Sequence, residues 1–99
     1  MNQTDAATPT TTIDDDDIRV TSWNFAEQGA ATGIHRHEYD YVVVPITGGQ
    51  FHVTSADGTI VEMTQVAGSV YRGTAGTEHN VEAASSAVFV ELEIKSRKE

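Results

Sequence analysis

Two histidines, His35 and His37, stand one residue apart just before a β-rich run, and their type and spacing point most directly to chemistry. Side chains of a strand alternate between its two faces, so both imidazoles are expected on the same face. Imidazole nitrogen is a good ligand for Zn, Fe, Cu, Ni and Co. The pair therefore predicts part of a metal site that is built on a sheet.

A third histidine, His79, follows His37 by 42 positions. Glycines punctuate the chain around these histidines, at Gly29, Gly48, Gly68 and Gly76. This order resembles the two sequence motifs of the cupin superfamily over roughly residues 18 to 94, and the segment after His37 is similar to that of short bacterial cupins, some of them associated with β-alanine degradation. The resemblance implies a single-domain jelly-roll β-barrel. It also implies one divalent metal per chain held by His35, His37 and His79, with iron favoured and Zn, Ni, Mn or Cu as alternatives.

The chain departs from the family pattern at two positions. Tyr41 stands where the family has a glutamate ligand, and Thr74 where it has a turn proline. Tyr41 shares the strand parity of the two histidines, so its ring is expected to point into the same cavity. It can be a phenolate ligand, a hydrogen-bond donor to bound water or substrate, or a pocket wall. The last two are favoured, because a phenol with a pKa of about 10 must lose its proton to bind as an anion.

Carboxylates elsewhere in the chain are further candidates. Regular alternation turns Glu38 and Asp40 away from the histidine face, although a bulge would let Glu38 replace the missing ligand. Glu91 and Glu93 share a strand face opposite an aliphatic row. If that row faces outward, Glu91 becomes an inward general acid or base and joins Tyr41 as a catalytic candidate. If the row faces inward, both glutamates are solvated, and composition favours this second orientation.

Two further side chains, Arg72 and His52, have roles that the sequence pattern does not decide. Arg72 can bind a substrate carboxylate inside the barrel or form a surface ion pair. His52 matches neither motif, and a surface position is favoured for it.

The rest of the pattern predicts an all-β fold without help from the family. Short β-rich runs alternate with glycine turns, Asp57 and Gly58 form a strong hairpin signal, and no 3.6-residue apolar period is present. A chain of 99 residues suits one domain. We expect a flexible acidic arm over residues 1–17, the barrel over 18–94 and a polar tail over 95–99.

Composition limits the binding partners and the cellular compartment that we expect for the protein. The net charge of −9 argues against nucleic acid and anionic membrane surfaces. The absence of cysteine excludes disulfides and thiol catalysis, and the chain shows neither a membrane-length apolar run nor a secretory signal, so a cytoplasmic location is predicted. Val42, Val43 and Val44 make one strand apolar on both faces, which predicts a homodimer.

These expectations converge on a metal-dependent enzyme acting on a small carboxylate or carbonyl compound. Within what cupins do, an Fe(II) dioxygenase with a three-histidine site is favoured, and a metal-dependent isomerase or lyase is an alternative. A cupin that binds or senses a small ligand or a metal without turnover is the competing hypothesis, because fold does not dictate function.

Overall fold

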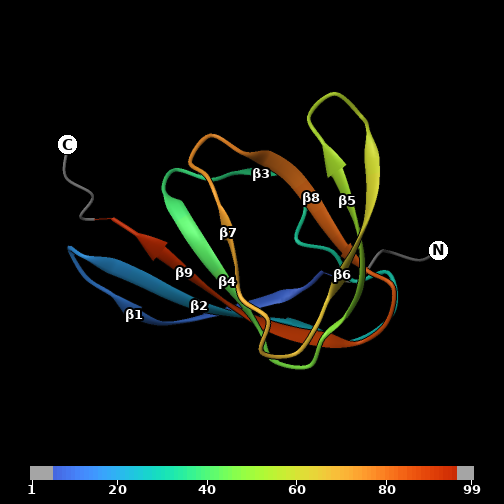
Figure 1. The fold of residues 1–99 in the computed structure, drawn as a ribbon, viewed down its shortest axis with the longest axis horizontal. Helices are drawn as coiled ribbons and strands as arrows, with labels where there is room; N and C mark the ends of the chain where they lie inside the picture. Colours follow the sequence, from blue (N-terminus) through green and yellow to red (C-terminus); the bar gives the residue numbers. More distant parts are fainter. Residues whose placement is uncertain (1–5, 96–99) are drawn as a thin grey trace.

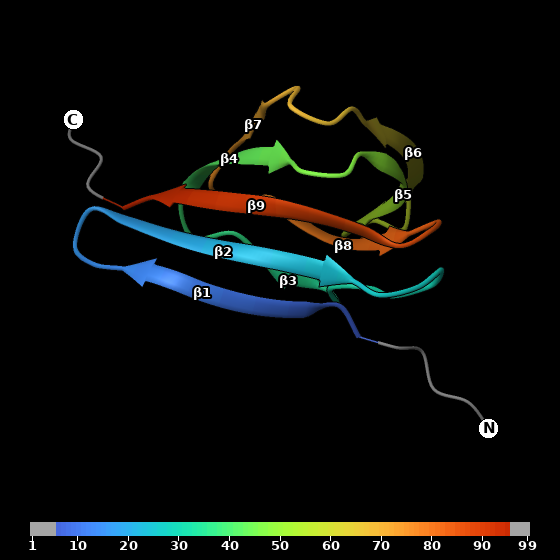
Figure 2. The ribbon, with the colours of Figure 1, turned by 90° about the horizontal axis from the view of Figure 1, so that it is seen from below.

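Two antiparallel sheets face each other in the computed structural model, which describes residues 6–95 (Figures 1 and 2). The larger sheet has, in spatial order, β1 (Thr8–Asp14), β2 (Ile18–Phe25), β9 (Ala87–Ile94), β4 (Asp40–Pro45) and β7 (Tyr71–Gly73). The smaller sheet has, in spatial order, β3 (His35–Arg36), β8 (Glu78–Ala83), β5 (Gly49–Ser55) and β6 (Ile60–Gln65). The all-β prediction is confirmed.

Three aromatic rings fill the space between the sheets. Phe25 and Phe51 are fully buried and Phe89 is nearly so, with ring centroids 5.3 to 5.8 Å apart. Phe25 and Phe89 come from neighbouring strands of the larger sheet, and Phe51 from the opposing sheet. This cluster fixes the distance between the two layers, and the site is built farther along the same strands.

The inward face of β9 changes from apolar to acidic along its length. Ala87 and Phe89 are followed by Glu91 and Glu93, which also point into the barrel, whereas the aliphatic row of Val88, Val90, Leu92 and Ile94 lies on the outer face. The favoured expectation of solvated glutamates was wrong. The acids are tolerated inside because Glu93 pairs with Arg19 from β2 and Trp23 hydrogen-bonds to Glu91.

The segment Thr8–Asp14 is a strand, so the prediction of a flexible arm was wrong for these residues. It pairs with β2, and the Thr11 and Thr21 hydroxyls lie 3.1 Å apart. Every β1 side chain is exposed, so no buried apolar row revealed the strand, yet its threonines favour extended backbone. Residues 1–5 of the predicted arm and 96–99 of the predicted tail lie outside the described residues.

One local expectation is confirmed. Asp57 and Gly58 turn the chain between β5 and β6, where Gly58 has φ of +90° and Ser55 N–H donates to Thr59 O at 2.8 Å. Pro45 is the last residue of β4, where its missing donor is tolerated. Across residues 6–95 the structure has no helix of the length and apolarity needed to cross a membrane.

Candidate metal centre

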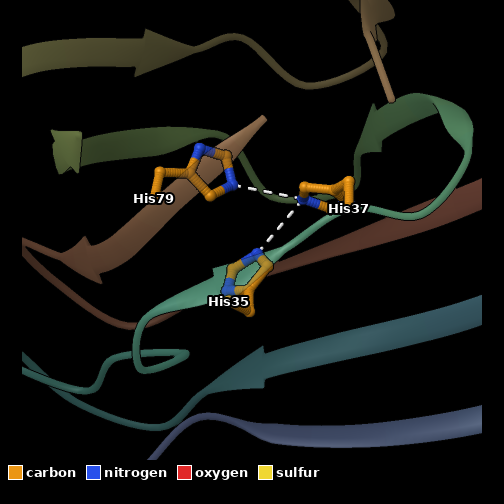
Figure 3. A group of neighbouring side chains, drawn as sticks. All are labelled: His35, His37 and His79. Carbon is orange, nitrogen blue, oxygen red and sulfur yellow. Dashed lines mark hydrogen bonds between the residues drawn. The ribbon is translucent and has the colours of Figure 1, made fainter. Parts of the chain in front are cut away.

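The three histidines singled out by their spacing meet inside the barrel. β3 pairs with β8 in a register that sets His35 opposite His79, and His37 follows β3 directly. The Nε2 atom of His37 lies 3.1 Å from Nε2 of His35 and 3.2 Å from Nε2 of His79 (Figure 3). Nitrogens that bind one metal at about 2.0 to 2.1 Å are separated by about 3.0 to 3.4 Å. The arrangement therefore fits a single ion.

The orientation of His35 is set by its other ring nitrogen. His35 Nδ1 lies 2.9 Å from Gly33 O, and a carbonyl only accepts, so Nδ1 carries the proton and Nε2 keeps its lone pair. Gly33 N–H donates in turn to Asn80 Oδ1 at 3.0 Å, and Gly33 itself adopts φ of +85°. Supporting contacts of this kind orient metal-binding imidazoles and raise their basicity.

Burial keeps the other two imidazoles neutral. Burial lowers the pKa of His37 to about 4, and repulsion from the protonated forms of His35 and His79 lowers it further. Burial and repulsion from the protonated form of His35 likewise lower the pKa of His79 to about 4. Neutral imidazole is the metal-binding form, so both side chains present lone pairs at pH 7.

Tyr41 lies against His37, as its strand parity predicted. The ring centroids are 3.8 Å apart and the planes differ by 16°, and the tyrosine is only 5% exposed. Burial raises the pKa of Tyr41 to about 12, with a further contribution from the charge of Glu91. The side chain is therefore a neutral phenol at pH 7, able to donate a hydrogen bond but poorly suited to bind a metal as an anion.

Two inward glutamates complete the site. Glu91 Oε2 lies 3.9 Å from His37 Nε2, and His37, Glu91 and Glu93 present ligand atoms within 4.8 Å of one another. Burial raises the pKa of Glu91 to about 7, and the charge of Glu93 raises it further. Because His37 is neutral, the contact between Glu91 and His37 is not an ion pair at pH 7. Glu93 is engaged by Arg19, whose Nη2 donates to Oε2 at 3.0 Å.

Other candidates lie outside this group. Glu38 is exposed, and Asp40 Oδ1 accepts a hydrogen bond from Ala75 N–H at 2.8 Å. Arg72 is exposed and pairs with Val42, whose side chain lies on the outer face of the sheet, so the inward role considered for Arg72 is wrong. His52 Nε2 lies 3.5 Å from Glu62 Oε2 near the surface, as favoured.

Arg19 and Trp23 are site residues that the sequence reasoning missed. Both belong to β2 and point to the same face of that strand as Thr21. The register places Arg19 opposite Glu93 and Trp23 opposite Phe89, on the inward face of β9. Trp23 also stacks on His35, with ring centroids 6.5 Å apart. Their common parity was a usable signal, but the pairing of β2 with β9 is a long-range contact that local patterns do not reveal.

Two cavities adjoin the histidines. An inner cavity of about 90 Å³ runs into the barrel, and an outer one of about 260 Å³ opens beside Pro9 and Thr11 of β1. They share a rim formed by Trp23, Thr32, His35 and Glu91. A small molecule at the histidines would therefore touch both spaces.

Known proteins share this architecture. The chain is 48% identical over 91 residues to the β-alanine degradation protein BauB of Pseudomonas aeruginosa, covering 90% of this chain and 94% of that protein. A cupin domain from Bordetella pertussis is 40% identical, with a TM-score of 0.88 over 97% of this chain and all of that chain. An RmlC-like cupin from Desulfovibrio desulfuricans shares the fold at 15% identity, with a TM-score of 0.72 over 96% of this chain and 90% of that one. No family model matches the chain. The predicted jelly-roll barrel is confirmed by these likenesses.

Proposed function

This chain belongs to the cupin superfamily, and from that premise we propose that His35, His37 and His79 hold one divalent metal ion in each chain. The observation that carries the proposal is the convergence of three Nε2 atoms at 3.1 and 3.2 Å with the Nδ1 of His35 committed to a carbonyl. Iron is the metal proposed first, with Zn, Ni, Mn and Cu as alternatives.

The proposed substrate is a small carboxylate or carbonyl compound. A divalent metal held by three neutral imidazoles keeps its full charge and supplies Lewis acidity toward an anionic or carbonyl oxygen. BauB is named for the degradation of β-alanine, itself a small carboxylate, which agrees with this class. The cavities beside the histidines are of a size for such molecules.

The protein supplies proton chemistry through Glu91 and Tyr41. With a pKa of about 7, Glu91 exists in both protonation states near neutral pH and can give or take a proton at its Oε atoms. Tyr41 stays protonated and offers a fixed O–H donor next to His37. We propose Glu91 as the general acid or base and Tyr41 as the residue that orients substrate or water.

Two reaction classes follow from different features. The three-histidine group, which places no protein charge on the ion, supports Fe(II)-dependent dioxygenation of a chelating carboxylate or diketone. Glu91 instead supports proton transfer, as in isomerisation or elimination. The two classes differ in that dioxygenation consumes dioxygen and proton transfer does not.

Oxygen uptake separates these classes. Fe(II)-loaded and Zn(II)-loaded protein are incubated with a panel of small carboxylates and diketones, while dioxygen and products are followed. Uptake with Fe(II) alone supports dioxygenation, and product without uptake supports proton transfer. If neither metal-loaded form gives product although each chain holds one metal ion, the enzyme proposal is contradicted. The protein would then be a cupin that binds or senses its ligand without turnover.

We also propose that the protein is a homodimer. On the outer face of the larger sheet the register aligns Val20, Leu92 and Val42 in one row, and Val90 and Val44 in the next. These side chains are only half-buried in the single chain. A contiguous apolar face normally marks an interface, and a second copy can cover it by two-fold symmetry. Location in the cytoplasm stays a prediction.

A further inference from the structure

The inner cavity beside the histidines has an almost entirely apolar wall. Its volume is about 90 Å³, and its deeper wall is formed by Val43, Val53, Met63, Tyr71, Val81 and Phe89. Among residues 6–95, the lining includes one carboxylate, Glu91 on the rim, and neither lysine nor arginine. A wall of this kind accepts apolar groups.

The outer cavity has the opposite character. Arg19, Arg36 and Glu93 line it, together with threonines from β1 and β2. His35 lies on the rim between the two spaces, and His37 lines the outer one. The histidine group therefore stands where a polar entrance meets an apolar interior.

We propose that the inner cavity binds the uncharged aliphatic end of the substrate, about three carbons long, while its carboxylate or carbonyl head lies at the three histidines. This inference rests on the proposed function and specifies its substrate class. The length follows from volume, because a methylene occupies about as much space as a water molecule, about 30 Å³. Each added methylene that enters should tighten binding about fourfold.

The first test is a chain-length series. Straight-chain monocarboxylates from acetate to octanoate are titrated into the metal-loaded protein, and binding is followed by the NMR shifts of valine methyl groups. Affinity should rise with each carbon up to about three beyond the carboxylate and then fall. Affinity that does not depend on length would overturn the inference.

Butyrate and β-alanine form a matched pair, because they differ only in a terminal methyl or ammonium group. Glu91 is the one carboxylate that lines the inner cavity among the described residues, and burying an ammonium ion against its apolar wall is costly. Butyrate should bind at least tenfold more tightly than β-alanine. Equal or tighter binding of β-alanine would overturn the inference and pair its ammonium with Glu91.

Substitutions at Val43 test the place of the tail. Val43 is 3% exposed and lines the inner cavity, so Val43→Ala should move the optimum one to two carbons longer, and Val43→Leu about one carbon shorter. Val44→Ala makes the same chemical change on the outer face of the same strand and should leave the optimum unchanged. An optimum that Val43→Ala does not move would contradict the inference, even if Val43→Leu fails to fold.

A metal-free arm separates this inference from the metal proposal. Primary alcohols of the same lengths are titrated into chelator-treated protein, where only the apolar cavity can select them. If the alcohols show the same optimal chain length and no preparation contains metal, the metal proposal is refuted and the inference about the inner cavity stands. If each chain holds one metal ion but binding shows no optimal chain length, the metal proposal stands and the inference about the inner cavity is refuted.

Discussion

The phenol ring of Tyr41 lies flat against the imidazole of His37, with centroids 3.8 Å apart and planes 16° from parallel. The tyrosine occupies the position at which cupins usually carry a glutamate ligand. It thus supports a histidine of the site from the side and keeps its proton, since burial raises the pKa of Tyr41 to about 12.

Tyr41→Phe should therefore keep full metal content and nearly full stability, because the ring is preserved and only a hydroxyl is removed. If a reaction is found, its kcat should fall tenfold or more, the scale of an oriented proton donor. Metal analysis and single-turnover kinetics measure the two effects. Loss of metal in Tyr41→Phe would show instead that the phenol is a ligand, and Tyr41→Glu should then restore binding.

Gly73 should not tolerate a side chain. A Cβ atom at this position would overlap Cζ, Cε2 and Oη of Tyr41. Gly73→Ala should lower the free energy of unfolding by about 1 to 3 kcal/mol, the usual effect of overpacking. Urea unfolding measures this change.

The control for Gly73 is a double-mutant cycle with Tyr41→Ala, which empties the space that the new methyl group needs. The two substitutions should be less than additive, because each removes the other's clash or cavity. Additive effects would show that the ring of Tyr41 is not what constrains Gly73.

The stability of the metal-free protein should depend on pH through three buried groups. His37 and His79 have pKa values of about 4 in the folded chain and 6.5 ordinarily, so between these values the unfolded chain binds more protons and stability falls as pH is lowered. Glu91 opposes this trend. The pKa of Glu91 is about 7 in the folded chain and 4.5 ordinarily, so its contribution to folding stability is lost as the pH rises between these values.

Glu91→Gln removes the opposing contribution. In the presence of chelator, its urea midpoint should climb more steeply between pH 4.5 and 6.5 than that of the unmodified protein. Parallel pH profiles of the two proteins would contradict the burial of Glu91 as a titrating group.

Local alternation predicted which site residues share a face, but not which face is inside. The parity of His35, His37 and Tyr41 was readable because it depends on neighbours in sequence. The direction of Glu91 was not readable, because the aliphatic row of β9 looked like the core row. The row faces outward because the partners of the two acids, Arg19 and Trp23, lie in the barrel interior, and both come from a strand distant in sequence.

The fold was predictable from turns and β-rich runs, with one exception at β1. Thr8–Asp14 has no buried row, so periodicity could not distinguish it from a loop, and its pairing with β2 depends on long-range register. The approach of His79 to His35 is likewise long-range. Only the family resemblance indicated it in advance.

The proposed dimer can be broken at the centre of the apolar outer face. Leu92→Lys places a charge between Val20 and Val42, which should convert a particle of about twice 10.7 kDa into a single chain. Thr64→Lys on the exposed side of β6 is the matched control and should stay dimeric. Sedimentation at micromolar concentration measures both. A monomer in the unmodified protein would remove the proposal.

The metal content of the histidine variants tests the proposed centre most directly. The protein and four single variants, His35→Ala, His37→Ala, His79→Ala and His52→Ala, are purified in parallel and analysed for transition metals. We expect one divalent metal per chain in the unmodified protein and in His52→Ala, and loss of metal in the other three variants. Full stoichiometry retained in His79→Ala would contradict the three-histidine site.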